Sequence, residues 1–309
     1  MKLLKPKFWN KKNNLMSLML LPVSLSLQLL ITIKNSFIKK VRFSIPVICV
    51  GNIYLGGTGK TPVSIEIVKI LKELGKKTAI IKKNYKKHND EFKLIESKNI
   101  KLFKNITRKR AIIEAEMNKF DCVVLDDGFQ DPSIAKNLNI LCFNEKQLIG
   151  NGMTLPSGPL REPLSAIKKC QIIIINGNKN YEFEKVIKEN SNNVSIYYAK
   201  YQPTNLQRFT SKNLLAFAGI GNPVNFFNLL EENNLTIKKK ISFSDHYNYS
   251  LKELKRLIDY SIKNNLQLIT TEKDFFRMKH FQLPQIECLN VNLELLNKNT
   301  FKNEISKYI

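Results

Sequence analysis

The sequence predicts an α/β fold with a doubly wound, mostly parallel sheet of the P-loop NTPase type. Three features lead to this prediction. An apolar, β-branched strand at residues 46–52 runs into a glycine-rich turn. A helix with apolar residues at helical spacing follows, from Thr61 to just before Gly75. Further apolar runs predict buried strands with crossovers between them, at residues 76–83, 120–126, 138–144 and 170–178.

The glycine-rich turn, GNIYLGGTGKTP at residues 51–62, predicts a phosphate-binding loop. The usual pattern, G-x-x-x-x-G-K-[ST], has a glycine where this chain has Tyr54, but the Gly-Lys-Thr end is in place. A strand, such a turn and a helix direct backbone N–H groups at a phosphate, and the alternative is a tight turn with a surface lysine. We expect ATP here, with Lys60 at its β- and γ-phosphates and the Thr61 hydroxyl on Mg²⁺. The expected ATP-binding residues are Tyr54, Leu55, Gly56, Gly57, Thr58, Gly59, Lys60 and Thr61.

The stretch FDCVVLDDGFQD, residues 120–131, predicts an apolar strand that ends in the two carboxylates Asp126 and Asp127. An aspartate at the end of a strand beside a phosphate loop is a Mg²⁺ ligand in P-loop enzymes, and ligands of open α/β sheets bind at that edge. The loop at residues 150–164 carries Arg161 and Glu162 near the same edge. Arginine there can hold phosphate bidentately, although surface charges on a loop are the commoner explanation.

Composition limits the classes of protein and partner. A chain of 309 residues suits two domains, or one large domain with an extension. The formal net charge of +24 indicates an anionic partner, or it reflects the abundance of Lys and Asn throughout the chain. No RNA-binding aromatic motif or Arg-rich helix is present, so we expect no nucleic-acid partner. Five scattered cysteines without a C-x-x-C pair predict reduced core residues, and three histidines leave little room for a His-rich metal site.

The N-terminal segment predicts membrane association. Residues 15–33 contain no charge over 19 residues, close to the length of about 20 that spans a bilayer. Both flanks are basic, so the distribution of charge gives no orientation. A segment that lies in the interface keeps both clusters near anionic headgroups, and we prefer it to a single span or a buried core helix. The clusters are Lys2, Lys5, Lys7, Lys11 and Lys12 before the segment and Lys34, Lys39, Lys40 and Arg42 after it.

Six motifs occur in the order seen in the tetraacyldisaccharide 4′-kinase family, which the chain resembles along most of its length. They are PVICVGNIYLGGTGKTP, DDGFQD, NGMTLPSGPLREPL, AFAGIGNPVNFF, FSDHYNY and TTEKDFFRM. That family's loop also lacks a glycine at the position of Tyr54. The resemblance implies phosphorylation of the 4′-hydroxyl of a lipid-anchored disaccharide 1-phosphate in lipid A biosynthesis, with ATP and Mg²⁺. It further implies a monomer at the cytoplasmic face of the inner membrane, in contact with anionic lipids.

The resemblance also implies a catalytic dyad. The family's base lies in a GDE stretch, which is NDE here and places the base at Asp90. Its histidine partner lies in F-x-D-H, which is His246 here. An alcohol loses its proton as the phosphoryl group arrives, and the dyad would position the base and stabilise its charge. The other implied roles are catalysis by Lys60 and Asp127, Mg²⁺ binding by Thr61, Asp126 and Glu162, and substrate binding by Glu91, Gln130 and Arg161.

The chain departs from the family pattern at three places. Asp131 ends the DDG-x-Q-H motif where the family has a histidine. Residues 83–85 read KNY in place of the usual R-G-Y, and the stretch from there to Asp90 is shorter than usual. These differences concern contacts with the acceptor substrate and leave the ATP site complete.

Three ranges are expected from these motifs. They are a membrane-anchoring segment at residues 1–34, a P-loop kinase core at 35–205 and a smaller α/β domain at 206–309. The polar, Pro-containing stretch 201–213 is the expected connection. His246 then comes from the smaller domain and Lys60 from the core, so we expect the active site in a cleft that domain closure completes.

Two other classes of protein remain as alternatives. One is a membrane-associated P-loop switch ATPase of the partitioning or metallochaperone type, which carries an extra lysine where this chain has Leu55. The other is a lipid-binding scaffold that uses no nucleotide, which leaves Lys60 and Asp126 without a role.

Overall fold

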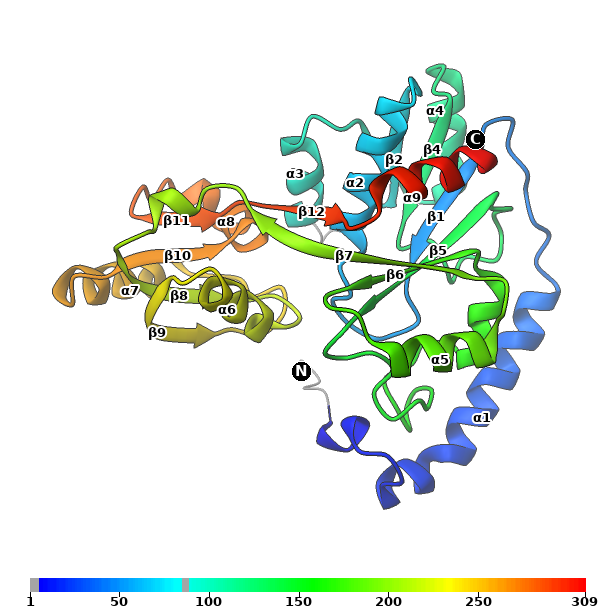
Figure 1. The fold of residues 1–309 in the computed structure, drawn as a ribbon, viewed down its shortest axis with the longest axis horizontal. Helices are drawn as coiled ribbons and strands as arrows, with labels where there is room; N and C mark the ends of the chain where they lie inside the picture. The colour runs from blue at the N-terminus through cyan, green and yellow to red at the C-terminus, as the bar shows by residue number, and fades with distance from the viewer. Residues whose placement is uncertain (1–5, 85–88) are drawn as a thin grey trace. The chain divides into compact units, whose positions relative to one another are not determined.

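The computed structural model describes residues 6–84 and 89–309. Lys2 and Lys5 of the first basic cluster, and residues 85–88 with Tyr85 of the KNY stretch, lie outside the described residues. The chain forms two compact units (Figure 1). Unit 1 comprises Met1–Asn84, Ile100–Lys200 and Glu294–Ile309, and unit 2 comprises Tyr85–Asn99 and Tyr201–Leu293.

The sheet of unit 1 contains the five strands that the sequence predicts. The described residues form a sheet of eight strands in the order β12-β7-β6-β5-β1-β4-β2-β3. The strands are β1 (Val47–Gly51), β2 (Thr78–Lys83), β3 (Leu102–Asn105), β4 (Cys122–Asp126), β5 (Leu138–Asn144), β6 (Ile172–Asn176), β7 (Ser195–Pro203) and β12 (Val291–Leu295). β1 pairs in parallel with both β4 and β5. The chain order therefore changes direction beside β1, which is where open α/β sheets bind ligands.

Helices cover this sheet, and the spacing of their apolar residues explains which helix face packs on the strands. α2 (Lys60–Glu73) buries Val63, Ile67, Ile70 and Leu71, and it packs against β1, β2 and β4. α4 (Arg108–Met117) packs against β2, β3 and β4. α5 (Tyr181–Asn190) and α9 (Lys298–Ile305) complete unit 1 with η2 (Leu164–Lys169). Because strand residues such as Ile48, Val124 and Ile174 are fully buried, the core lies on both faces of the sheet.

Unit 2 is a smaller α/β unit. Its described strands are all parallel, in the order β11-β10-β8-β9. They are β8 (Asn213–Ala218), β9 (Thr236–Ser242), β10 (Gln267–Thr271) and β11 (Ile286–Leu289). Its helices are α3 (Asn89–Ser97), α6 (Pro223–Glu232), α7 (Leu251–Lys263) and α8 (Glu272–Met278). α3 packs against α8, which sets Asp90 beside the TTEKDFFRM motif.

Two details differ from the linear division that the sequence suggests. Residues 85–99 belong to unit 2 although they lie within the expected core range, and residues 294–309 belong to unit 1. The expected connection at 201–213 is also more ordered than its composition indicates. β7 extends to Pro203, and Phe209 is fully buried, because its ring packs into the apolar core of unit 2.

The N-terminal helix α1 (Leu15–Ser36) is mostly exposed, unlike a core helix. Among the described residues it is the one helix that is long and apolar enough to cross a membrane, by length and composition alone. Eleven of its large apolar side chains are exposed, including Leu15, Leu25 and Leu30. The two buried side chains in α1 are polar, Ser17 and Ser24. The short helix η1 (Lys7–Asn10), which precedes α1, buries Trp9.

Candidate active site

The phosphate loop lies between β1 and α2, as predicted. Gly59 caps α2 with a φ of 85°, in the left-handed region that suits glycine, so a side chain there would strain the turn. A Cβ at Gly57 would meet nothing within 4 Å, so open space adjoins the loop. The Asn176 amide, at the end of β6, donates to the carbonyl of Thr58, and the Asn52 amide donates to the carbonyl of Tyr54 at 2.6 Å. These contacts hold the loop from two strand ends.

Asp126 lies at the centre of a buried polar group behind the loop. The Thr61 hydroxyl donates to Asp126 Oδ2 at 2.7 Å, and the Lys82 ammonium lies 2.6 Å from the same oxygen. Lys82 comes from β2, Asp126 from β4 and Thr61 from α2, so three elements converge on one carboxylate. The structure therefore brings together two of the three expected Mg²⁺ ligands.

Asp127 is a half-exposed carboxylate between two cations. Its Oδ1 lies 3.4 Å from Lys60 Nζ and 3.2 Å from an Nη of Arg161. Burial alone would raise the pKa of Asp127, but the Lys60 ammonium and the Arg161 guanidinium outweigh it, and the pKa lies below its usual value. Asp127 adopts a φ of 59°, and its carbonyl accepts a hydrogen bond of 2.6 Å from Arg108. The carboxylate is therefore ionised and faces the loop lysine.

Several buried oxygens around the loop have no hydrogen-bond partner among the described residues. They are Asn52 Oδ1, Thr58 Oγ1, Asp126 Oδ1 and Asn176 Oδ1. Buried polar atoms in folded proteins are nearly always paired, so a cluster of unpaired acceptors indicates a missing partner. Oxygen ligands of this kind are what Mg²⁺ prefers, and Thr61 with Asp126 fits such an ion. No group of three His, Cys, Asp or Glu residues in the described chain is arranged to hold a metal by itself. An ion bound by Thr61 and Asp126 would have to take its other ligands from nucleotide phosphates or water.

The remaining residues expected in unit 1 have defined contacts. Glu162 forms an ion pair of 2.8 Å with Lys169, so the structure pairs this expected Mg²⁺ ligand with a lysine. The Gln130 amide donates to the Asn52 carbonyl at 2.8 Å and accepts from Arg161 at 3.4 Å. Asp131 accepts from Ser133 at 2.6 Å and pairs with Arg108 at 3.4 Å. Asp131 therefore takes part in a local turn and ion pair at the position where the family has a histidine.

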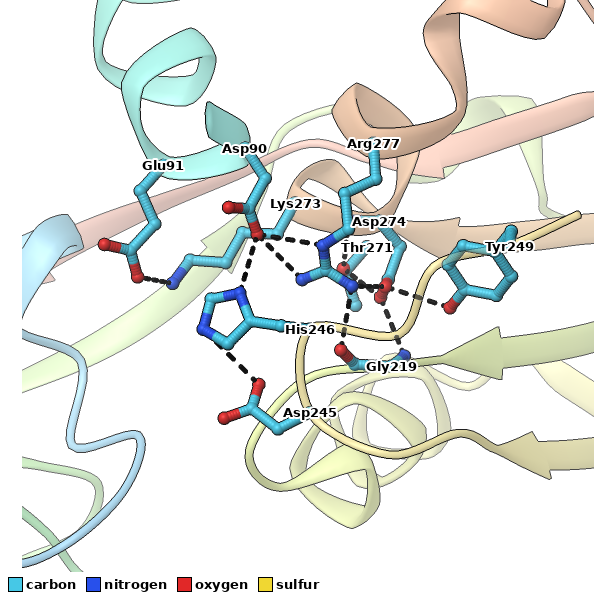
Figure 2. A network of polar contacts seen from close by, with 10 residues as sticks. All are labelled: Asp90, Glu91, Gly219, Asp245, His246, Tyr249, Thr271, Lys273, Asp274 and Arg277. Carbon is cyan, nitrogen blue, oxygen red and sulfur yellow. Dashed lines mark hydrogen bonds and ion pairs between the residues drawn. The ribbon is translucent and has the colours of Figure 1, made fainter. Parts of the chain in front are cut away.

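The second group of expected residues lies in unit 2 and centres on Asp90 (Figure 2). Asp90 is buried, and its Oδ2 accepts two hydrogen bonds from Arg277, at 3.0 Å from Nε and 2.8 Å from an Nη. His246 Nδ1 lies 3.5 Å from the same oxygen. Asp90 and His246, the two residues of the predicted dyad, therefore lie together within unit 2, and Arg277 binds the same oxygen of Asp90 (Figure 2).

The arginine is itself held by a buried carboxylate. Arg277 donates to Asp274 Oδ1 at 2.7 Å and to the Gly219 carbonyl at 2.9 Å. Asp274 also accepts from Tyr249 at 2.9 Å and from the Gly219 N–H at 3.0 Å. A Cβ on Gly219 would lie 2.8 Å from the Tyr249 hydroxyl, so this network requires glycine there. The packing fixes Arg277, and Arg277 fixes Asp90.

The charges of this cluster shift the titration of the dyad. Burial would raise the pKa of Asp90, but the hydrogen bond from His246 and the charge of Arg277 outweigh it and hold the pKa far below its usual value. The hydrogen bond to Asp90 raises the pKa of His246, against the opposing effect of burial. Asp90 is therefore an anion at neutral pH, and His246 keeps its proton to a higher pH than an isolated histidine does.

Glu91, also expected in substrate binding, forms an ion pair of 2.7 Å with Lys273. Lys82, Asp274 and Arg277 were not predicted as site residues. Lys82 appears in the sequence as the polar end of a strand, and Arg277 lies 187 residues from Asp90 in the chain. The one available signal was the TTEKDFFRM motif, which contains Asp274 and Arg277 three residues apart, on one face of a helix.

Comparisons with known proteins decide the family. A family model described as LpxK, tetraacyldisaccharide-1-P 4′-kinase, matches residues 16–103 and 90–309. The chain belongs to this family. Tetraacyldisaccharide 4′-kinase of Pelagibacter ubique is 41% identical over 314 aligned residues, which cover 99% of this chain and 98% of that protein. The protein of the same name from Rickettsia canadensis is 33% identical, with the same coverage.

A solved structure shares the fold. LpxK from Aquifex aeolicus, in complex with ATP, superposes with a TM-score of 0.72 at 23% identity and covers 95% of this chain and 99% of that one. This likeness confirms the predicted P-loop-type α/β fold with a second, smaller α/β part. Membership of the tetraacyldisaccharide-1-P 4′-kinase family makes the chain a kinase, as the motifs predicted, and leaves the switch-ATPase and scaffold alternatives without support.

Proposed function

We propose that this protein transfers the γ-phosphoryl group of ATP to the 4′-hydroxyl of a lipid A disaccharide 1-phosphate precursor. The observation that carries the proposal is a complete phosphate loop, with Lys60 facing Asp127, in a chain that matches this kinase family over nearly its whole length. The ATP-bound relative from Aquifex aeolicus supports ATP as the donor.

The groups of unit 1 would act on the nucleotide. In this proposal Lys60 and the N–H groups of the loop bind the β- and γ-phosphates, and Arg161 neutralises charge on the transferred group. Thr61 and Asp126 would hold Mg²⁺, which neutralises phosphate charge when it is bound. Lys82 holds Asp126 in place, because it pairs with one carboxylate oxygen, Oδ2, and leaves the other, Oδ1, without a partner among the described residues.

The groups of unit 2 would act on the acceptor alcohol. The pair of Asp90 and His246 would accept the hydroxyl proton as a unit, so its apparent pKa belongs to both residues. Asp90 supplies the negative charge, and Arg277 and Asp274 fix its position. Because Lys60 and Asp90 lie in different units, the proposal requires both units to act on one substrate molecule.

The membrane side of the proposal comes from α1. Its apolar side chains are mostly exposed, and basic residues such as Lys11, Lys12 and Lys39 flank it. An anionic bilayer would cover the apolar surface and attract the basic flanks, by about 1 kcal/mol for each basic side chain near the surface. We infer that α1 lies in the cytoplasmic interface of the inner membrane, where a sugar on an acyl anchor is presented, and that the protein acts as a monomer.

A direct assay tests this function. Purified full-length protein would receive γ-labelled ATP, Mg²⁺ and a disaccharide 1-phosphate lipid in mixed micelles, and thin-layer separation would follow the label. We expect label in the lipid at the 4′ position, and none when the acceptor carries a 4′-deoxy sugar. Label in inorganic phosphate alone, at the same rate with and without lipid, would contradict the proposal and favour an ATPase.

A further inference from the structure

Helix α1 is amphipathic in the reverse sense of an ordinary surface helix. Its polar residues Ser17, Ser24 and Gln28 face the rest of unit 1, and most of its large apolar residues are exposed. Their separations of seven and four residues place the three on one side of the helix, over about 16 Å of its length. We call these three residues the polar seam. A helix that only anchored the chain in lipid would not need such a seam.

The polar seam contacts one loop, residues 151–161, at three successive places. The Asn151 amide donates to Ser17 Oγ at 3.0 Å. Ser24 Oγ accepts from the Ser157 N–H at 3.0 Å and donates to the Thr154 carbonyl at 3.0 Å. The Gln28 amide donates to the Arg161 carbonyl at 3.3 Å. Ser24 and Ser157 are fully buried, so these hydrogen bonds are shielded from water.

The same loop is bound on its other side to the phosphate loop. The Arg161 N–H donates to the Ile53 carbonyl at 2.6 Å, and the Leu55 N–H donates to the Pro159 carbonyl at 2.8 Å. Tyr54 forms an isolated antiparallel bridge with Leu160. Residues 151–161 therefore lie between α1 and the start of the phosphate loop. The backbone carbonyl of Arg161 contacts α1, and its N–H contacts the residue before Tyr54.

Arg161 then extends its guanidinium to Asp127, beside Lys60. We propose that Ser24 and Gln28 are positioning residues for Arg161, so that the helix which meets the membrane also sets the arginine at the phosphate site. This inference rests on the proposed function for its kinetic consequence. Its structural part concerns only the seam and the loop.

The seam also bears on how α1 meets the bilayer. Residues 17–28 are held against the rest of unit 1 by hydrogen bonds to the loop 151–161. This loop carries charged and polar groups that need water. A helix that crossed the hydrocarbon core would have to break the seam and leave its serines and Gln28 among acyl chains. A helix that lies in the interface keeps the seam on the protein and its apolar faces in lipid.

The substitutions Ser24→Thr and Ser24→Val form a matched pair, because the two new side chains have the same shape and differ only in a hydroxyl against a methyl group. In the full-length protein we expect Ser24→Val to lower kcat on the lipid substrate by about 10- to 100-fold and Ser24→Thr to stay within about threefold of wild type. The same substitution two residues on, Ser26→Val, is the control, because Ser26 is exposed and bonds only within its own helix. All four proteins should sediment equally with vesicles of phosphatidylcholine and phosphatidylglycerol.

A double-mutant cycle separates positioning from general damage. In an Arg161→Ala background, Ser24→Val should cost less than threefold, because the group it positions is already absent. Equal losses in both backgrounds, or equal activity of the Val and Thr variants, would overturn the proposal. Loss of vesicle binding by Ser24→Val alone would also overturn it, since the hydroxyl would then serve the membrane contact.

Hydrogen exchange tests the seam even if the proposed kinase activity fails. The N–H groups of Leu55, Ser157 and Arg161 should exchange at least about 10-fold faster in Ser24→Val than in Ser24→Thr or Ser26→Val. Unchanged protection at all three amides would show that α1 does not hold the loop. If Ser24→Val exchanges faster but the wild-type protein has no lipid kinase activity, the role of the polar seam is supported and the proposed function is contradicted.

Discussion

The two polar clusters of this protein satisfy their charges in different ways. Around the phosphate loop, Asp127 has 37% of its side chain exposed, and several buried oxygens such as Asp126 Oδ1 have no partner among the described residues. In unit 2, Asp90 and Asp274 are almost fully buried, and Arg277 pairs with both. The first cluster lacks partners that a ligand would supply, whereas the second supplies its own. Substitutions should therefore affect ligand binding at the first and folding as well as chemistry at the second.

The largest expected effect is at the ligand-dependent cluster. Lys60→Ala removes the cation that faces both Asp127 and the proposed phosphates, so kcat/KM should fall by at least about 10³-fold, since charge stabilisation provides most of phosphoryl-transfer catalysis. Thermal unfolding without nucleotide should change little, because the ion pair of Lys60 in the described part of the chain is with a half-exposed carboxylate. Lys69→Ala, on the same helix and away from the loop, is the control for both measurements. A kcat/KM within tenfold of wild type would remove Lys60 from the mechanism.

The self-paired cluster should respond in both stability and rate. Asp90→Asn leaves Arg277 without half of its charge partners, and breaking a buried pair costs about 3–5 kcal/mol of unfolding free energy. It should also lower kcat by about 10²- to 10⁴-fold, with little change in ATP affinity, because a general base contributes that much. His246→Ala should act in the same direction, and the double variant should be clearly less than multiplicative.

The control for that cycle is Asp259→Asn, an exposed carboxylate on α7. Steady-state kinetics and chemical denaturation on the same preparations separate the two effects. Full multiplicativity of the Asp90 and His246 variants, or a large rise in the ATP dissociation constant on loss of Asp90, would show that the two residues do not form a catalytic unit.

Ligand stabilisation should distinguish the two clusters next. Mg²⁺ with a non-hydrolysable ATP analogue, at 100 times its dissociation constant, should stabilise the folded protein by about 2.7 kcal/mol, or roughly 5–10 °C. Asp126→Asn should move the Mg²⁺ needed for that shift to a higher concentration, whereas the exposed Asp121→Asn should not. The same Mg²⁺ midpoint in all three proteins would place the ion elsewhere.

The smallest expected effect is a displacement of the pH profile. The pKa of His246 is raised above the usual value of about 6.5, so His246 stays protonated to a higher pH than a free histidine. A protonated dyad cannot accept the hydroxyl proton, so kcat/KM should fall as the pH is lowered. Arg277 lowers the pKa of His246 through its charge, so Arg277→Gln should move this limb to higher pH. Arg277→Lys keeps the charge and should retain the wild-type limb. A shift to lower pH in Arg277→Gln would reverse the proposed role of this arginine.

The two clusters also differ in how far the sequence predicts them. The phosphate loop is a local pattern, and the order of strand, Lys60 and helix follows from the continuous stretch 46–74. The strand that ends in Asp126 needs only its apolar run and the rule that parallel strands share one edge. Asp90 and His246 came from resemblance alone, because one helix acid and one loop histidine carry no local signal.

Long-range pairing explains most of what was not predicted. The bond from Arg277 to Asp90 joins residues 187 positions apart, and Lys82 reaches Asp126 only because β2 lies next to β4. β12 alternates apolar and polar residues, but at five residues it is too short for its sequence to indicate which sheet it joins. The spacing of Ser17, Ser24 and Gln28 indicates one face of α1. The sequence of an apolar helix does not indicate which of its faces packs against the rest of unit 1.

The division of the chain between the units has a consequence for synthesis on the ribosome. Residues 201–293, almost all of unit 2, are made before residues 294–309, which belong to unit 1. At about 5–20 residues per second the first unit waits roughly 5–20 s for α9 after most of its sheet has emerged. During that time Tyr197 lacks the Phe301 ring and the Glu304 carboxylate that it contacts in the folded protein. Unit 2 can therefore finish folding first, and a nascent chain stalled before residue 294 would hold a complete unit 2 and an incomplete unit 1.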